Sequence, residues 1–192
     1  MNPESPLVRC ELPIEDVQVI AAARGSKIRG VLLADGRVDR ALNGDPGEYS
    51  VSSMAFDLEE RVVVSAESVD FGPRAEIFRL RVFTETDSSR ALFSPRMQPA
   101  AACPDELDLA GICEGTFQPV ILRSRNQMTV ELVPTVESRI NVIVDCALIL
   151  MGSTGARLLV EHDRKLPLSL RISTSGKVIE RAIARAAELV VI

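Results

Sequence analysis

The second half of the chain constrains the fold most strongly, because it consists of short apolar runs separated by brief polar segments. Runs of strand-forming residues cover 117–124, 127–134, 140–151, 156–162 and 168–173. The segments between them, RSRNQ, TVES, GSTG and DRKLP, are rich in residues that favour turns. Strands joined by connections this short pair in antiparallel order. The sequence therefore predicts an antiparallel meander over this half.

Both ends of the chain carry patterns that are typical of helices. PIEDVQVIAAARG predicts a helix over 13–24 that begins at Pro13 and ends before Gly25. Its predicted apolar stripe is Ile14, Val17, Ile20 and Ala21. The last segment, GKVIERAIARAAELVVI, predicts a C-terminal helix packed on the sheet, with apolar residues recurring at helical spacing at Ile179, Ala182, Ile183, Ala186 and Leu189.

Between the first helix and the meander the pattern favours further strands. Asp35-Gly36 predicts a tight hairpin, 61–69 and 76–85 alternate as strands do, and 49–60 fits either a strand or a short helix. A helix followed by such a hairpin resembles the opening of roadblock-type and profilin-type domains, but the pattern is too common to assign a family.

Three prolines between 95 and 104 mark the one candidate internal boundary. We therefore expect a region at 1–94, a proline-rich connection at 95–115 and a meander with a helix at 116–192, or one domain over 1–192. The predicted fold class is α+β, strand-dominated, with an N-terminal and a C-terminal helix.

Composition excludes several classes of protein. A net charge of −5, no tryptophan and one tyrosine argue against a nucleic-acid partner. The longest apolar candidate, 140–151, is too short and too polar to span a membrane, and the N-terminus lacks the pattern of a signal peptide. We therefore expect no membrane partner, a cytoplasmic location and reduced cysteines. The excess of arginine over lysine suggests a bacterial coding bias.

The segment ACPDELDLAGICEG contains Cys103 and Cys113 and raises three possibilities, a metal site, a disulfide and a reactive thiol. The cysteine spacing does not match known zinc sites, and a disulfide is disfavoured in a reducing compartment. A thiolate at Cys103 would gain from the start of a short helix ending at Gly111, but Asp105 and Glu106 oppose it. We interpret the segment as a capped helix and expect no metal or cofactor.

Two groups of residues are candidates for a functional site. If Met151 lies opposite Ala156, then Asp145 lies directly across from His162, a couple suited to acid–base catalysis or to a structural pair. The second group consists of Arg79 and Arg81 on one strand face and Arg123 and Arg125 on another. If those faces coincide, the four arginines form a ligand-binding patch for phosphate or carboxylate; otherwise they are a solvated surface.

Other ionisable residues offer no recognisable site. The acidic pairs Glu15-Asp16 and Glu59-Glu60 are interpreted as surface residues, and GSTG at 152–155 as a turn. The sequence leaves enzymatic activity undecided. We expect a non-catalytic binding or assembly module, with a second copy or another protein as partner. The alternative is a small-molecule-binding protein or enzyme that recognises an anionic metabolite in a pocket between the meander and the C-terminal helix.

Overall fold

The structure, a computed structural model, describes residues 6–34, 48–70, 76–85, 97–99, 107, 109–113, 115–133, 136–152, 155–163, 166 and 168–192. Its described strands form one sheet of seven strands and one of five. The described helices are α1 (Ile14–Ala23), α3 (Ala110–Cys113) and α4 (Gly176–Arg185). The α+β, strand-dominated class is confirmed, with antiparallel pairing throughout except between two strands.

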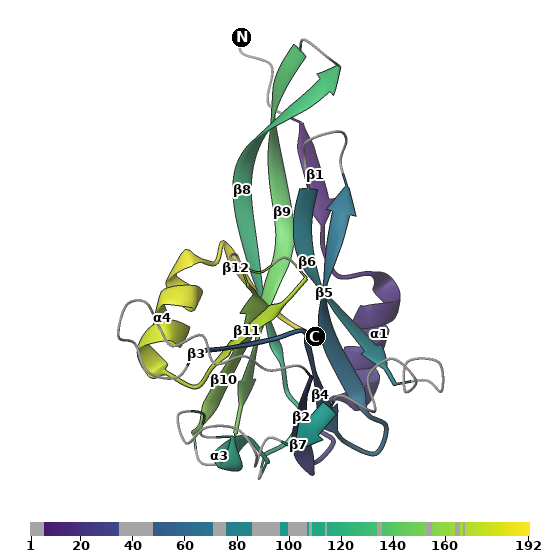
Figure 1. Ribbon diagram of the computed structural model, residues 1–192, viewed down its shortest axis with the longest axis vertical. Coiled ribbons are helices and arrows are strands. Elements are labelled where there is room, and N and C mark those ends of the chain that lie inside the picture. The colour runs from purple at the N-terminus through teal and green to yellow at the C-terminus, as the bar shows by residue number, and fades with distance from the viewer. Residues whose placement is uncertain are drawn as a thin grey trace.

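The seven-stranded sheet runs in the order β12-β8-β9-β10-β11-β3, with β1 parallel to β9. Its strands are β1 (Leu7–Cys10), β3 (Glu48–Val51), β8 (Val120–Val133), β9 (Val136–Met151), β10 (Arg157–His162), β11 (Leu170–Ser173) and β12 (Glu188–Val191). The meander expected after residue 116 is its centre, since β8, β9, β10 and β11 are consecutive neighbours. The long β8–β9 hairpin projects beyond the rest of the molecule (Figure 1).

The five-stranded sheet runs in the order β6-β5-β4-β2-β7. Its strands are β2 (Gly30–Ala34), β4 (Ser53–Asp57), β5 (Val62–Asp70), β6 (Glu76–Thr84) and β7 (Met97–Pro99). The ambiguous segment 49–60 is thus strand on both sides of Ser52. The hairpin predicted at Asp35-Gly36 lies outside the described residues.

The main core lies where the two sheets face each other. Apolar side chains from both sheets and from α1 are fully buried there, including Ile20, Phe56, Leu80, Leu148 and Leu158. The opposite face of the seven-stranded sheet packs against α4, through Ala147, Ile149, Leu159, Val178 and Ile179. Figure 1 shows α1 and α4 on opposite sides of the molecule. Because successive side chains of a strand point to opposite faces, the seven-stranded sheet contributes to two separate apolar layers.

Three boundaries predicted from the sequence are wrong. RSRNQ is not a connection, because β8 continues through it; this part of the hairpin carries the exposed residues Arg125, Asn126 and Gln127. The C-terminal helix ends at Arg185, and Leu189 belongs to β12, which pairs with β8. Where a short helix ending at Gly111 was expected, α3 begins at Ala110 and ends at Cys113; most of the segment before Gly111, with Cys103, lies outside the described residues.

The helix α1 matches the predicted range 13–24, but its buried face does not. Asp16 and Ile20 are fully buried, whereas Ile14 is 71% exposed. The buried side is therefore rotated from the predicted stripe and carries a carboxylate. None of the helices that the structure describes has the length and apolar character to cross a membrane.

Candidate functional site

The candidate site begins at an irregularity in β9. Leu122 pairs with Ala147, but Arg123 pairs with Asp145, so Cys146 is an extra residue in β9 and forms a bulge. β10 pairs with β9 as far as Ala147, and β1 pairs with Asn141 to Val144. The bulge therefore lies at the point along β9 where the neighbouring strand changes from β10 to β1.

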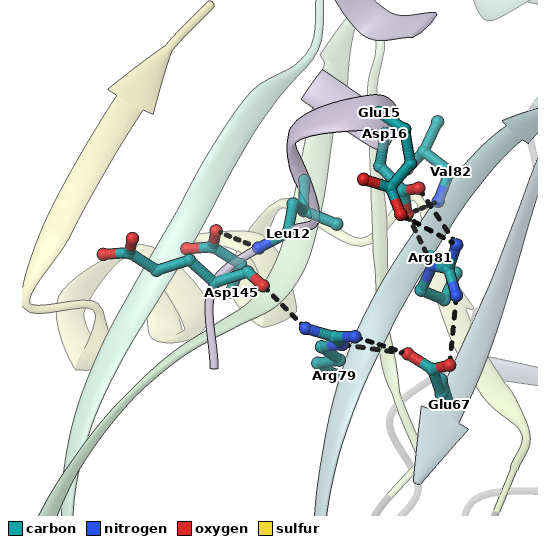
Figure 2. Close-up of polar contacts among 9 residues, drawn as sticks. Leu12, Glu15, Asp16, Glu67, Arg79, Arg81, Val82 and Asp145 are labelled. Carbon is teal, nitrogen blue, oxygen red and sulfur yellow. Dashed lines mark hydrogen bonds and ion pairs between the residues drawn. The ribbon is translucent and has the colours of Figure 1, made fainter. Parts of the chain in front are cut away.

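Asp145 is 1% exposed and accepts three hydrogen bonds. Arg123 donates two of them, from Nε at 2.8 Å and from Nη2 at 3.2 Å, and the backbone N–H of Leu12 donates the third at 2.9 Å. Figure 2 shows the bond from Leu12 to Asp145. The bidentate guanidinium and the backbone N–H together satisfy most of the hydrogen-bonding capacity of this buried carboxylate.

Asp16 repeats this arrangement on the five-stranded sheet. Its carboxylate is fully buried and accepts bonds from Arg81 Nε at 2.8 Å and Arg81 Nη2 at 3.2 Å. The backbone N–H of Val82 donates a third bond at 2.7 Å. Leu12 and Asp16 belong to the same short segment that leads into α1. One sheet therefore holds this segment by its backbone at Leu12, and the other holds it by the Asp16 side chain.

A third carboxylate connects the arginines of β6. Glu67 accepts hydrogen bonds from Arg79 Nε at 2.9 Å and from Arg81 Nη1 at 3.0 Å. Arg79 Nη1 also donates to the backbone oxygen of Glu11 at 3.1 Å. Figure 2 shows both guanidinium groups turned toward Glu67. The side chain of Glu11 in turn lies 3.3 Å from Arg123 Nη1, which links the two halves.

We call this cluster the polar joint; its residues are Glu11, Asp16, Glu67, Arg79, Arg81, Arg123, Asp145 and Glu188, the last lying 3.3 Å from Arg123. The hydrogen bonds that Arg81 donates to Asp16 raise the pKa of Arg81, and those that Arg123 donates to Asp145 raise the pKa of Arg123. Partial burial acts to raise the pKa of Glu67, but the bonds and charges of Arg79 and Arg81 lower it overall. These shifts favour the charged forms of Arg81, Arg123 and Glu67.

The predicted pairing of Asp145 with His162 is wrong. Met151 lies opposite Arg157 and not Ala156, so the register of β9 and β10 is shifted by one residue, and Glu161 lies opposite Ala147. The turn holds five residues, closed by a hydrogen bond from Gly152 N–H to the oxygen of Ala156. His162 stacks on Phe78, with ring centroids 4.5 Å apart and planes 3° from parallel. The carboxylate of Asp145 is hydrogen-bonded to Arg123 and not to His162.

The structure brings three of the four candidate arginines into one cluster. Arg79, Arg81 and Arg123 meet at the polar joint, and Arg125 lies exposed on β8. Each of the three is bonded to carboxylates of this chain, so an incoming phosphate or carboxylate would have to displace one of them. In this arrangement the three arginines help to join the two sheets through ion pairs within the chain.

The described cysteines have the character of structural residues. Cys10, Cys113 and Cys146 form no disulfide among themselves, and burial raises the pKa of the Cys10 and Cys113 thiols. Within the described ranges, His, Cys, Asp and Glu side chains nowhere gather into a group that could hold a metal ion.

A cavity of about 600 Å³ lies beside α1, away from α4. One wall is a face of α1 that includes Gln18, Val19 and Ala22, and the other is the 58–60 turn between β4 and β5. The alternative expectation placed a pocket between the meander and the C-terminal helix. There the apolar side chains that join α4 to the sheet are packed together, and Ile179 is fully buried.

Sequence reasoning missed every acidic residue of the polar joint except Asp145. Asp16 was assigned to the surface with Glu15, and Glu11, Glu67 and Glu188 were not singled out. One signal was present: Asp16, Ile20 and Ala23 share a helical face, so the stripe containing Ile20 also contained a carboxylate.

Comparison with known protein families, curated proteins and solved structures finds no match to this chain.

Proposed function

We propose that the protein is a non-catalytic assembly module that pairs with a second copy of itself through β12. The observation that carries the proposal is the exposed apolar edge of the seven-stranded sheet. Among the described strands, β12 has one hydrogen-bonding neighbour, β8. Leu189 and Val191 on β12 are 51% and 63% exposed. An edge strand with free backbone groups and apolar side chains is a template for another strand.

Charge favours a second copy in antiparallel orientation. Glu188 is the one charged residue of β12 and lies at its start. Two antiparallel copies place their Glu188 side chains at opposite ends of the strand pair, roughly 10 Å apart. The apolar residues then face one another across a two-fold axis, as an isologous interface requires. A parallel arrangement would set the two carboxylates side by side.

The non-catalytic part of the proposal rests on how the ionisable groups are used. Asp145 and Arg123, the strongest candidates for chemistry, are bonded to each other, and Asp16 and Arg81 repeat the pattern. Groups that are saturated by internal bonds stabilise the fold and have little capacity left for a substrate.

The test is the mass of the protein in solution as a function of concentration, measured by sedimentation velocity. A four-residue strand gives a small interface, so we expect a reversible dimer with a dissociation constant on the order of 10 µM or weaker. Leu189→Lys/Val191→Lys should be a monomer at every concentration. A matched control is Ile14→Lys/Met151→Lys, which adds the same charge at exposed apolar residues off the β12 edge and should still dimerise. A wild type that stays monomeric, or a β12 variant that stays dimeric, would contradict the proposal.

A further inference from the structure

The cavity beside α1 has the form of a ligand site. Its volume of about 600 Å³ lies within the range of small-molecule pockets. Its accessible apolar surface includes the half-buried Val19 and Ala23 of α1; Leu58 and Val62 also line it but are almost fully buried. A concave apolar surface of this size can accept a hydrocarbon chain or ring.

The sequence of α1 explains why one helix serves both the core and the cavity. Asp16 and Ile20 face the sheet and are fully buried. Glu15, Val19 and Ala22 recur at intervals of four and three residues on a neighbouring face and line the cavity. Small side chains at Ala22 and Ala23 leave the space that a larger residue would fill.

The charged residues that line the cavity all carry the same sign. They are Glu15, Glu59 and Glu60, and each is exposed. Arg61, the next residue along the chain, is engaged by Asp57 at 3.8 Å and Glu85 at 2.8 Å. Arg81 lies 4.0 Å from Glu15 while it is held by Asp16 and Glu67. The charged residues that line the cavity are therefore negative, and the guanidinium groups of Arg61 and Arg81 are already bound to other carboxylates.

From this combination we infer that the cavity binds a small amphipathic cation, a ligand with an apolar body and a protonated amine. The apolar body lies against Val19 and Ala23 of α1, and the ammonium group faces Glu59 and Glu60 at the rim. Charge complementarity disfavours an anionic ligand in this cavity, because a carboxylate or phosphate would meet like charge here. This inference is independent of the proposed dimer.

Isothermal titration with two ligands of equal chain length separates the contributions of charge and apolar contact. Octylamine should bind to the wild type, and octanoate, with the same hydrocarbon chain and the opposite charge, should bind at least about tenfold more weakly. Butane-1,4-diamine, which has charge without a long apolar body, should also bind more weakly than octylamine. No heat from octylamine, or equal affinity for octanoate, would overturn the inference.

Variants then place the site. Glu59→Gln/Glu60→Gln should weaken octylamine binding about fivefold, as expected for the loss of two exposed ion pairs. The control Glu76→Gln/Glu180→Gln makes the same change of net charge at exposed residues outside the cavity and should bind as the wild type does. Ala22→Trp should block the cavity and abolish binding.

Ala22→Leu, a milder change at the same exposed helix position, tests the same point if Ala22→Trp does not fold. Octylamine affinity that survives both substitutions would overturn this location. Leu189→Lys/Val191→Lys should retain full octylamine affinity, so the failure of the proposed dimer and the failure of the cavity can be told apart.

Discussion

Asp145 and Arg123 lie opposite each other on β9 and β8, joined by hydrogen bonds of 2.8 Å and 3.2 Å. The same carboxylate accepts the backbone N–H of Leu12. One side chain thus fixes three segments: the two strands of the long hairpin and the segment that leads into α1. This is possible because the bulge at Cys146 interrupts strand alternation between Ala147, which packs toward α4, and Asp145.

Removing the Asp145 carboxylate should destabilise the fold strongly. Asp145→Ala leaves Nε and Nη2 of Arg123 and the N–H of Leu12 without their acceptor in a site that is nearly closed to water. We expect the free energy of unfolding, measured by urea denaturation, to fall by about 3 kcal/mol. This is near the lower end for a buried pair, since 17% of the Arg123 side chain is exposed.

The double variant Asp145→Ala/Arg123→Met is the control for this prediction. It removes both charges, so its loss of stability should be clearly smaller than the sum of the two single losses. Additive losses would show that the two residues act independently.

The pH dependence of stability should include a contribution from Glu67. Its pKa is lowered from the ordinary 4.5 in the folded protein, so the unfolded chain binds its proton more readily. The contribution is therefore present above pH 4.5 and is lost as the pH falls through the lower folded pKa. Glu67→Gln should flatten the plot of unfolding free energy against pH in this acidic range. Glu180→Gln, on an exposed residue of α4, provides the matched loss of one charge, and an equal flattening there would contradict the assignment.

The last residues of the chain should respond to substitution with a period of two. Val190 is half-buried against the main core, whereas Val191 is 63% exposed. Val190→Asp should therefore lower the free energy of unfolding by about 2 kcal/mol, because it places a charge against apolar surface. Val191→Asp should change it by less than about 0.5 kcal/mol. Equal losses of stability, measured by urea denaturation, would be inconsistent with β12 as a strand.

The sequence predicted the meander, β5, β6 and the range of α1, because each has a regular period over several residues. It did not predict β12, since ELVVI continues the helical spacing of α4. Only pairing with β8 determines that this segment is extended. Such a preference for tertiary context over local pattern is common in strands.

The candidate site was predicted less well, for two local reasons. One additional residue in the turn at 152–156 shifts the register of β10, and a shift of one changes which residues meet across the strands. The residues around Cys146 show no sequence pattern that predicts the bulge. The sequence leaves open whether the four arginines gather; three of them do, and their partners Asp16 and Glu67 are far away in sequence and could be found only from the fold.

The parallel pairing of β1 with β9 also bears on how the chain is made. Leu7 leaves the ribosome early, but its neighbour in the sheet, Asn141, is synthesised much later. Closing so large a loop is entropically costly and slow. The N-terminal strand therefore cannot take its place in the sheet until most of the polypeptide has been synthesised.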